Sequence, residues 1–362
     1  QGTLYGRNTM VGALKVVTFR PDGNYRLNGD VSIGSFDYRR VRAIAAVPLG
    51  DELAASISGL WTQRDGRTFN RALGIRVNDR EASNLRATLR YHGNPDWDVI
   101  LRVGHMRDKG DGMTATPLAP GNIMAPLYAS LFETSAQERA FSAYRETNAS
   151  LDATWKPDGF NLQYIGSMIW IDNDVRADLT GGQRPDLGAI DDRMANRQSS
   201  HELKFQPDSL FGGAVDLLLG AYAFHEKSDA VMLSGTLPRV TVIDRAATTS
   251  HALFGQATVN LTDRLAATLG GRWTRDRKEL VATLPGGAAV NAKKTFEQFT
   301  PKVDVQFEAS DNVMLYASYS RGFKGGGFNG RAGNAASMST PFDAEQVSAW
   351  EAGVKSELFD RR

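Results

Sequence analysis

The sequence predicts an all-β protein, a transmembrane antiparallel β-barrel of which about 14 strands are present. Three observations lead to this fold class: apolar and polar residues alternate with a period of two, the alternating segments are long, and short turns alternate with long connections. No run approaches the roughly 18 apolar residues that a membrane-spanning helix needs. Strands that cross a bilayer must pair all their backbone groups, so a closed barrel is expected.

The alternation is clearest in the stretch from Leu265 to Thr274. One face carries Leu265, Ala267, Leu269, Gly271 and Trp273, and the other carries Thr268, Gly270, Arg272 and Thr274. Residues 253–261, 299–308 and 313–320 alternate in the same way. Such strands have one dry and one wet face. Alternation alone is also compatible with a soluble β-sandwich.

Strand length and aromatic placement favour the membrane barrel over the sandwich. The alternating segments extend over about ten residues, which matches the 9–11 residues that cross a bilayer with tilt. Aromatic residues gather where these segments are predicted to end, at Trp61, Trp97, Trp155, Phe160, Trp170 and Trp273. Amphipathic rings at that level are typical of the two girdles of an outer-membrane barrel.

The connections also sort by length. Tight, turn-rich links occur at 48–51, 92–96, 156–159, 262–264 and 310–312, and wide polar spans are predicted as loops at 64–80, 107–139, 174–196, 227–247, 276–295 and 321–343. Outer-membrane barrels have short periplasmic turns and longer extracellular loops. In a β-sandwich, loop length is not expected to differ between the two ends of the strands.

Composition excludes several classes of function. The 42 basic and 41 acidic residues leave a formal net charge of +1, so the excess of Lys and Arg that marks a nucleic-acid partner is missing. The sequence has no cysteine, which excludes disulfides, thiolate zinc sites and cysteine nucleophiles. We therefore expect no nucleic-acid partner, no cofactor and no metal site.

Two stretches carry a family resemblance. Residues 1–18 read QGTLYGRNTMVGALKVVT, and residues 316–362 contain YASYSRGFKGGGFNG followed by FDAEQVSAWEAGVKSELFDRR. Both resemble TonB-dependent outer-membrane receptors, in which the first motif ends the N-terminal plug domain. The matching plug positions are Gly2, Leu4, Tyr5, Gly6, Arg7, Asn8 and Gly12. Lys15 and Trp350 depart from the residues that the family often has there, which are Asn and Tyr.

The resemblance implies a domain organisation and a function. Residues 1–20 would be the C-terminal end of the plug, and residues 21–362 part of a barrel that has about 22 strands in receptors of this kind. The TonB box and the rest of the plug are expected before Gln1, and closing strands after Arg362. The expected function is import of a scarce solute, such as a ferric siderophore, by a monomer in the Gram-negative outer membrane. The expected partners are outer-membrane lipid, TonB and the small-molecule ligand.

Candidate site residues lie on the inward faces of the strands or in the loops. Charged lumen or loop residues are predicted at Arg272, Lys302, Arg321 and Lys324. By resemblance, Arg7 of the plug would face a carboxylate of the wall, and Glu202 and Glu351 are the two candidates. For any single one of these residues, a solvated polar face is an equally good interpretation.

Rival chemistries have weaker signals. Residues 325–330 satisfy G-x-G-x-x-G after a strand, but no apolar helix follows to offer its N-terminus to a phosphate. His201-Glu202 and His225-Glu226 lack the second histidine of a zinc helix. A barrel lipase or protease is a minor alternative, and no catalytic residue is predicted. The stronger alternative is a passive pore of about 14 strands. Residues 1–18 distinguish the two, because they would fold inside the lumen of a receptor and fray outside a simple channel.

Overall fold

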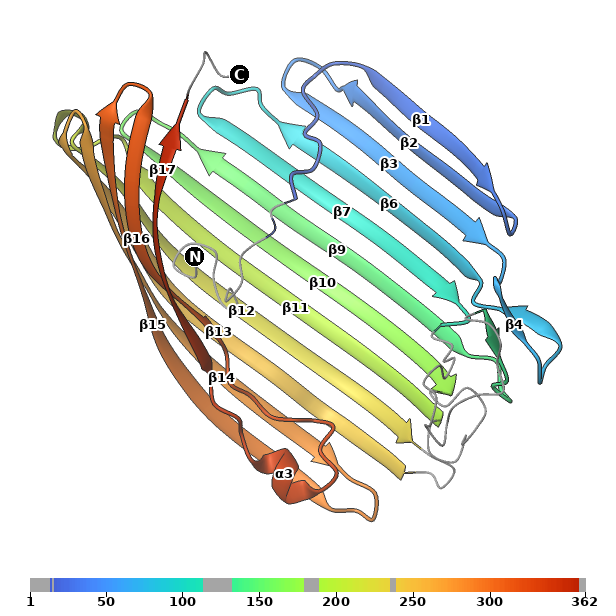
Figure 1. Cartoon of the computed structure of the whole chain (residues 1–362). Coiled ribbons are helices and arrows are strands. Elements are labelled where there is room, and N and C mark those ends of the chain that lie inside the picture. Colours follow the sequence, from blue (N-terminus) through green and yellow to red (C-terminus); the bar gives the residue numbers. More distant parts are fainter. Residues whose placement is uncertain (1–13, 15, 113–131, 179–188, 235–238, 358–362) are drawn as a thin grey trace.

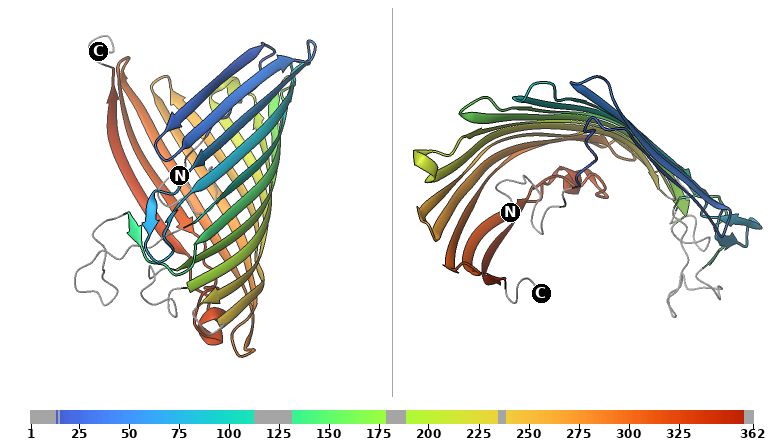
Figure 2. Two further views of the ribbon diagram at one scale, coloured as in Figure 1. Left: turned by 90° about the vertical axis from the view of Figure 1, so that its right-hand side faces the viewer. Right: turned by 90° about the horizontal axis from the view of Figure 1, so that it is seen from above.

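The protein is built around one large antiparallel sheet that curves into an open half-cylinder (Figures 1 and 2). The computed structural model describes residue 14 and residues 16–112, 132–178, 189–234 and 239–357. The sheet has 14 strands, and each pairs with the next along the chain, which confirms the predicted fold class and strand number. In order, the strands are β1 (Arg26–Gly34), β2 (Tyr38–Pro48), β3 (Leu53–Arg64), β6 (Arg80–Tyr91), β7 (Trp97–Gly110), β9 (Phe141–Trp155), β10 (Phe160–Asp178), β11 (Ala189–Pro207), β12 (Val215–Ser234), β13 (Arg239–Thr262), β14 (Leu265–Thr283), β15 (Ala289–Ser310), β16 (Val313–Lys324) and β17 (Glu345–Ser356).

The two faces of the sheet separate apolar from polar residues, as the alternation predicts. In one row across β11 to β15, Leu203, Leu253, Trp273 and Phe299 point to the convex side and are 40–62% exposed. The next row holds Phe254, Arg272 and Thr300, which are 5%, 1% and 1% exposed on the concave side. An exposed apolar face of this extent needs lipid as its solvent.

The connections are sorted to the two ends of the half-cylinder. Turns at 49–52, 92–96, 156–159, 208–214, 263–264 and 311–312 lie at the upper edge of the sheet in Figure 1. The opposite edge carries the long connections 65–79 and 325–344 together with the short turns 35–37 and 284–288. The loops predicted at 174–196, 227–247 and 276–295 are wrong, because β10 to β15 continue as hairpins through most of these residues. Beyond the lipid, both faces of a hairpin meet water. The strands there remain paired, but their sequence no longer alternates between apolar and polar residues, so the pattern does not predict them as strands.

Smaller elements decorate the loop side. Strands β4 (Thr68–Asn70), β5 (Ile75–Val77) and β8 (Glu133–Thr134) form a separate three-stranded sheet, and a short helix, α3 (Ala335–Ser339), follows β16. A 3-10 turn, η1 (Phe211–Gly213), lies among the short turns. Within the described ranges, none of the helices has the length and apolar character required for crossing a membrane.

The sheet has two free edges in the part of the chain that the structure describes. Strands β1 and β17 are the outermost strands, and they do not pair with each other (Figure 2). A pore of 14 strands would require this pairing to satisfy the edge backbone groups in lipid. The structure therefore gives the passive-pore alternative no support.

Candidate functional site: the concave wall and its mouth

Arg272 is the most enclosed charge of the concave wall. Its side chain extends from β14 and is 1% exposed. The guanidinium lies 5.3 Å from the ring centre of Tyr222 and 5.2 Å from that of Phe254, and its Nε donates to Thr274 Oγ1 at 3.1 Å. Two aromatic faces stabilise a partly desolvated cation. Arg272 is thus on the lumen side, as predicted, but it is part of the wall's packing rather than open to solvent.

Other charges of the concave wall are neutralised in pairs. Glu202 Oε1 lies 2.5 Å from Lys204 Nζ, two residues along β11, and Lys302 Nζ lies 2.7 Å from Asp304 Oδ2 on β15. Residues two apart point to the same face of a strand, which brings these opposite charges together. The charge of Glu202 also interacts with that of Arg272. Lys302 is confirmed as a concave-wall residue.

The last two strands hold the remaining predicted wall residues. Glu351 accepts a hydrogen bond from Tyr316 Oη at 2.6 Å, and Lys324 Nζ lies 3.9 Å from Glu345 Oε1. Arg321 donates to Tyr319 Oη at 3.4 Å, while its Nε is buried without a partner among the described residues. Strand β16 pairs with β15 only up to Ser320, so Arg321 and Lys324 lie where it has separated from the wall.

A cluster of two arginines and two aspartates lies near the short-turn end of the concave face. Arg20 precedes β1 and lies 3.8 Å from Asp98 and 3.6 Å from Asp152. Arg90 lies 2.8 Å from Asp98 and donates to the carbonyl oxygen of Pro21 at 3.0 Å. The segment before β1 is therefore fastened to the wall by charge. The plug positions Gly2 to Gly12, including Arg7, lie outside the described residues, so pairing of Arg7 with Glu202 or Glu351 stays a prediction.

The connection between β16 and β17, residues 325–344, covers the concave wall at the loop side. Met338 of α3 is fully buried against Leu280, Ala282 and Val290 of β14 and β15. Figure 2 shows this segment inside the curve of the sheet. Two ion pairs fix it: Arg331 Nη2 lies 2.6 Å from Asp192 Oδ2 on β11, and Lys294 Nζ lies 3.0 Å from Asp343 Oδ1. We call residues 325–344 the mouth loop.

The glycine run of the mouth loop has a packing role. A Cβ on Gly326 would collide with the ring of Phe296 and would lie 2.6 Å from the carbonyl oxygen of Phe342. Gly327 and Phe342 exchange two backbone hydrogen bonds of 2.9 and 3.1 Å. Only glycine allows the backbone to approach this closely. The G-x-G-x-x-G pattern therefore allows the mouth loop to pack on the wall, which fits the absence of a following apolar helix.

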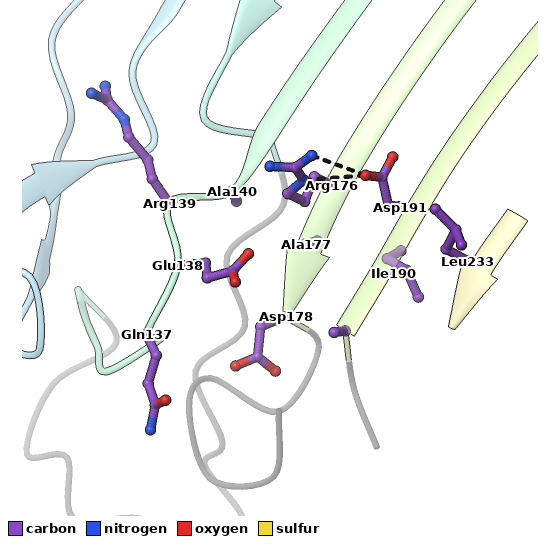
Figure 3. A pocket seen from close by; sticks show the side chains of 11 residues that line it. Gln137, Glu138, Arg139, Ala140, Arg176, Ala177, Asp178, Ile190, Asp191 and Leu233 are labelled. Atoms are coloured by element: carbon purple, nitrogen blue, oxygen red, sulfur yellow. Dashed lines mark hydrogen bonds and ion pairs between the residues drawn. The ribbon is translucent and has the colours of Figure 1, made fainter. Parts of the chain in front are cut away.

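A cavity of about 420 Å³ opens at the loop side, between residues 137–140 and the hairpin of β10 and β11. Glu138 and Asp178 lie on opposite sides of this space, and Arg176 is bound to Asp191 at 3.0 Å (Figure 3). Ile190 and Leu233 complete an apolar edge. Arg176, Asp191 and Leu233 have the same parity as the outward residues Trp170 and Arg197, so these lining residues belong to the convex side of the hairpin and not to the concave wall.

A charged junction fixes the base of the nearby loops. Asp79 Oδ1 accepts from the backbone nitrogen of Asp111 at 2.8 Å, and Asp111 Oδ2 accepts from that of Asp79 at 3.3 Å. Arg139 bridges the two carboxylates, with a contact of 3.2 Å to Asp79. Burial, followed by the charge of Asp111, raises the pKa of Asp79 above its ordinary value. The pKa of Arg139 is raised by its hydrogen bond to Asp111.

Comparison with known families agrees with this architecture. The family described as TonB dependent receptor-like, beta-barrel matches residues 18–362. The chain is 33% identical over 307 residues to the metal-pseudopaline receptor CntO of Pseudomonas aeruginosa, a match that covers 78% of this chain and 34% of CntO. The chain thus spans about a third of the length of this curated relative.

Solved structures share the fold. The ferric yersiniabactin uptake receptor FyuA of Yersinia pestis matches with a TM-score of 0.84 and 20% identity, covering 99% of this chain and 56% of FyuA. The siderophore receptor PiuA of Acinetobacter baumannii matches with a TM-score of 0.80 and 14% identity, covering 100% of this chain and 59% of PiuA. The chain belongs to the TonB-dependent receptors of the Gram-negative outer membrane, and its 14 long strands are wall strands of their β-barrel.

Proposed function

We propose that this receptor imports a metal ion held by a small-molecule chelator, with energy delivered through TonB. The observation that carries the proposal is the 33% identity to CntO, whose name describes a metal-pseudopaline receptor. A ferric siderophore is the first substrate class that we expect, because FyuA and PiuA are named for siderophores. A metal complex of the pseudopaline type is the second, and the sequence relation to CntO favours it.

The mouth suits a polar metal complex. Metal chelators present carboxylate, amide or hydroxyl groups, which need cations and hydrogen-bond donors from the protein. On the concave side of the loop end, Arg331 and Lys294 supply cationic groups, and Asp192 and Asp343 supply acceptors. These four residues lie at the loop side, where a solute from outside the cell would arrive first.

The concave wall suits passage rather than retention. Conduction requires that a solute binds strongly enough to enter and weakly enough to leave. The pairs Lys204–Glu202 and Lys302–Asp304 present charge that is already neutralised within the wall. A solute that passes them therefore meets polar surface without a deep electrostatic trap.

The partners follow from the family and belong to the same proposal. TonB, a small-molecule ligand and a monomeric receptor are expected, and the activity is transport without catalysis. CntO, FyuA and PiuA are all named as receptors, which supports a role in binding and uptake.

The test is uptake of radioactive metal by the source bacterium. Cells with the gene deleted, and the same cells complemented, receive radioactive iron as ferric siderophores or a radioactive metal as its pseudopaline complex. We expect one class of complex to enter only complemented cells, and entry to cease when TonB is removed. Uptake that survives loss of TonB would indicate a passive pore, and uptake that survives loss of the gene for both classes would overturn the proposal.

A further inference from the structure

A cavity of about 460 Å³ lies on the concave face of the first strands, between β1, β2, β3 and β6. Its polar lining consists of Asn28, Asp30, Arg42, Ser58 and Asn84. In the strand register these side chains alternate with small outward residues, so they share one face of the sheet. Asn84 lies six residues before Arg90 on β6, and this even spacing places both on the concave face. The cavity therefore opens into the lumen.

Most of the polar lining is not engaged by the wall itself. Within the part of the chain that the structure describes, the side chains of Asn28, Ser58 and Asn84 form no hydrogen bond. Ile44 and Leu60 add an apolar surface beside them. Amide and hydroxyl groups that the protein leaves unpaired are available to hydrogen-bond a solute. The cavity thus suits an organic molecule with both polar groups and a carbon skeleton.

Arg86 brings a positive charge to the edge of this cavity. It is the register partner of Ser58 on β3, and it lies two residues from Asn84 on the same face of β6. Its register partner on β7 is Gly104, which has no side chain to cover it. The guanidinium is half-buried and forms neither an ion pair nor a hydrogen bond with any described residue. Arg86 therefore has its donors free for an anion.

The carboxylates that β1 to β9 present on this face all have other partners among the described residues. The shortest contacts are those of Asp30 with Arg42 at 2.6 Å, Asp98 with Arg90 at 2.8 Å, Asp108 with Arg80 at 2.5 Å, Asp152 with Arg20 at 3.6 Å, and Glu146 with Tyr144 at 2.5 Å. Arg102, one row from Arg86, adds a second cation whose charge interacts with that of Arg86. Its Nε is buried without a hydrogen-bond partner in the described ranges. The cavity edge thus has an excess of positive charge.

The cavity lies deeper in the barrel than the mouth loop. Ser58 is five residues from the short-turn end of β3 at Leu53, and Asn84 is seven residues from that of β6 at Tyr91. A strand crosses the bilayer in about ten residues, so these positions are near the middle of the membrane. On β11 and β15 the wall charges are neutralised in pairs. The strands around Arg86 therefore differ from the rest of the wall in their charge.

We propose that Arg86, Asn84 and Ser58 form a second solute site inside the barrel, which binds a carboxylate of the metal chelate on its way through. This inference rests on the proposed function and adds a place on the path below the mouth. A guanidinium donates two parallel hydrogen bonds to a carboxylate. Ser58 and Asn84 donate to neighbouring polar groups of the chelate, and Ile44 and Leu60 contact its carbon skeleton.

The first test measures the charge preference of the site without reference to the imported solute. S58C places a thiol in the cavity, and none of the 362 residues is a cysteine. Cells that express the complete gene receive a thiosulfonate reagent that carries either a sulfonate or a trimethylammonium group. Each reaction rate is divided by that of the same reagent with free cysteine. S58C/R86Q is compared with S58C/R80Q, the matched control, because Arg80 lies on the same face of β6 and has its own carboxylate.

We expect S58C to react about tenfold faster with the sulfonate reagent than with the trimethylammonium reagent after this correction. A positive charge about 5 Å away attracts the first reagent and repels the second. S58C/R86Q should lose the preference, and S58C/R80Q should keep it. A thiol that reacts with neither reagent, or a preference that survives the loss of Arg86, would overturn the proposal.

The second test measures passage. It uses the radioactive complex that complemented cells take up in the uptake test, with heat-dependent electrophoretic mobility to verify that each variant is folded. R86Q should lower the maximal rate of uptake about tenfold, which is the loss of one hydrogen-bonded charge. R86K should lower it less, because lysine keeps the charge but not the bidentate geometry. Binding to energy-depleted cells should stay the same in both variants, and R80Q should match the unchanged protein in both measurements.

The outcomes separate this inference from the proposed function. Unchanged uptake by R86Q, or an equal loss in R80Q, would overturn the second site while the proposed function stands. Absence of uptake by the unchanged receptor would overturn the proposed function instead. The thiol reaction would then still show whether the cavity selects anions.

Discussion

Arg331 of the mouth loop and Asp192 of β11 form an ion pair of 2.6 Å that closes a gap of 139 residues in the sequence. The pair crosses the concave side of the strands between them, because the mouth loop emerges from β16 and reaches β11 (Figure 1). It joins two regions that have no strand pairing with each other. The mouth loop is therefore attached at its tip as well as at its base.

Removing this ion pair should loosen the tip of the mouth loop. Arg331 is largely exposed, so R331A should cost at most about 1 kcal/mol, and the change should be local rather than global. Hydrogen exchange of residues 329–334 should become faster, with the strands unaffected. The control is R193A, which removes an arginine 3.7 Å from Asp191 on the opposite face of β11. Faster exchange in both variants would show that Arg331 has no special role.

The packing of the glycine run can be tested separately. G326A should displace the mouth loop, because the added Cβ would overlap Phe296 and the carbonyl oxygen of Phe342. Overpacking of this kind costs about 1–3 kcal/mol, and limited proteolysis of residues 325–344 should report it. The matched control is G333A in the same loop, where a Cβ would meet no atom within 4 Å. Equal protease resistance of both variants would contradict the close approach.

The convex face should reject charge according to depth. L269R places a guanidinium in the middle of the apolar part of β14, where Leu269 is 57% exposed, and should cost about 2–4 kcal/mol. Q63R places the same group near the loop-side end of β3 and should cost at most about 1 kcal/mol. Folded fractions after insertion into phosphatidylcholine vesicles measure the difference. A soluble sandwich would show no such dependence on position along the strand.

The junction of Asp79, Asp111 and Arg139 should respond to pH. The raised pKa of Asp79 means that the folded form keeps this proton at a pH at which the unfolded chain has lost it. The stabilisation is thus complete below the ordinary pKa and is lost as pH rises through the raised one. Hydrogen exchange of residues 68–77, measured relative to the intrinsic rate at each pH, should quicken as pH rises above the ordinary pKa of an aspartate. D79N should remove this dependence, whereas D37N, in the β1–β2 turn, should preserve it.

The strands and their faces could be predicted because the bilayer imposes the pattern. Along β14, Leu269 and Trp273 point outward and Arg272 and Thr274 inward, as the alternation from Leu265 to Thr274 predicts. The aromatic chain of Trp97, Trp155 and Phe160, with ring centres 5.6 and 5.3 Å apart, lies at the short-turn end as expected. Trp170 and Trp273 instead lie inside their strands, because these strands continue beyond the lipid.

The site could be predicted only in part. The inward parity of the strands identified Arg272 and Lys302. The aromatic rings of Tyr222 and Phe254 that enclose Arg272 come from β12 and β13, and no local sequence pattern predicts these contacts. The contact between Arg331 and Asp192 depends on how far the mouth loop reaches, which spacing in the sequence does not encode. The cavity beside Arg176 arises where the strand hairpins rise past the lipid, in residues predicted to be loops.

The height of the β12 and β13 hairpin has a consequence for evolution of selectivity. Strand pairing continues to Ser234 and Arg239, close to the tip of the hairpin. The rim of the barrel at this place is therefore made of paired strands and not of an irregular loop. Replacing one inward side chain on paired strands alters the contact made at that position and leaves the backbone of the neighbouring residues in place. A receptor built in this way can acquire a new substrate by single substitutions at the rim, while the part of the barrel within the membrane stays unchanged.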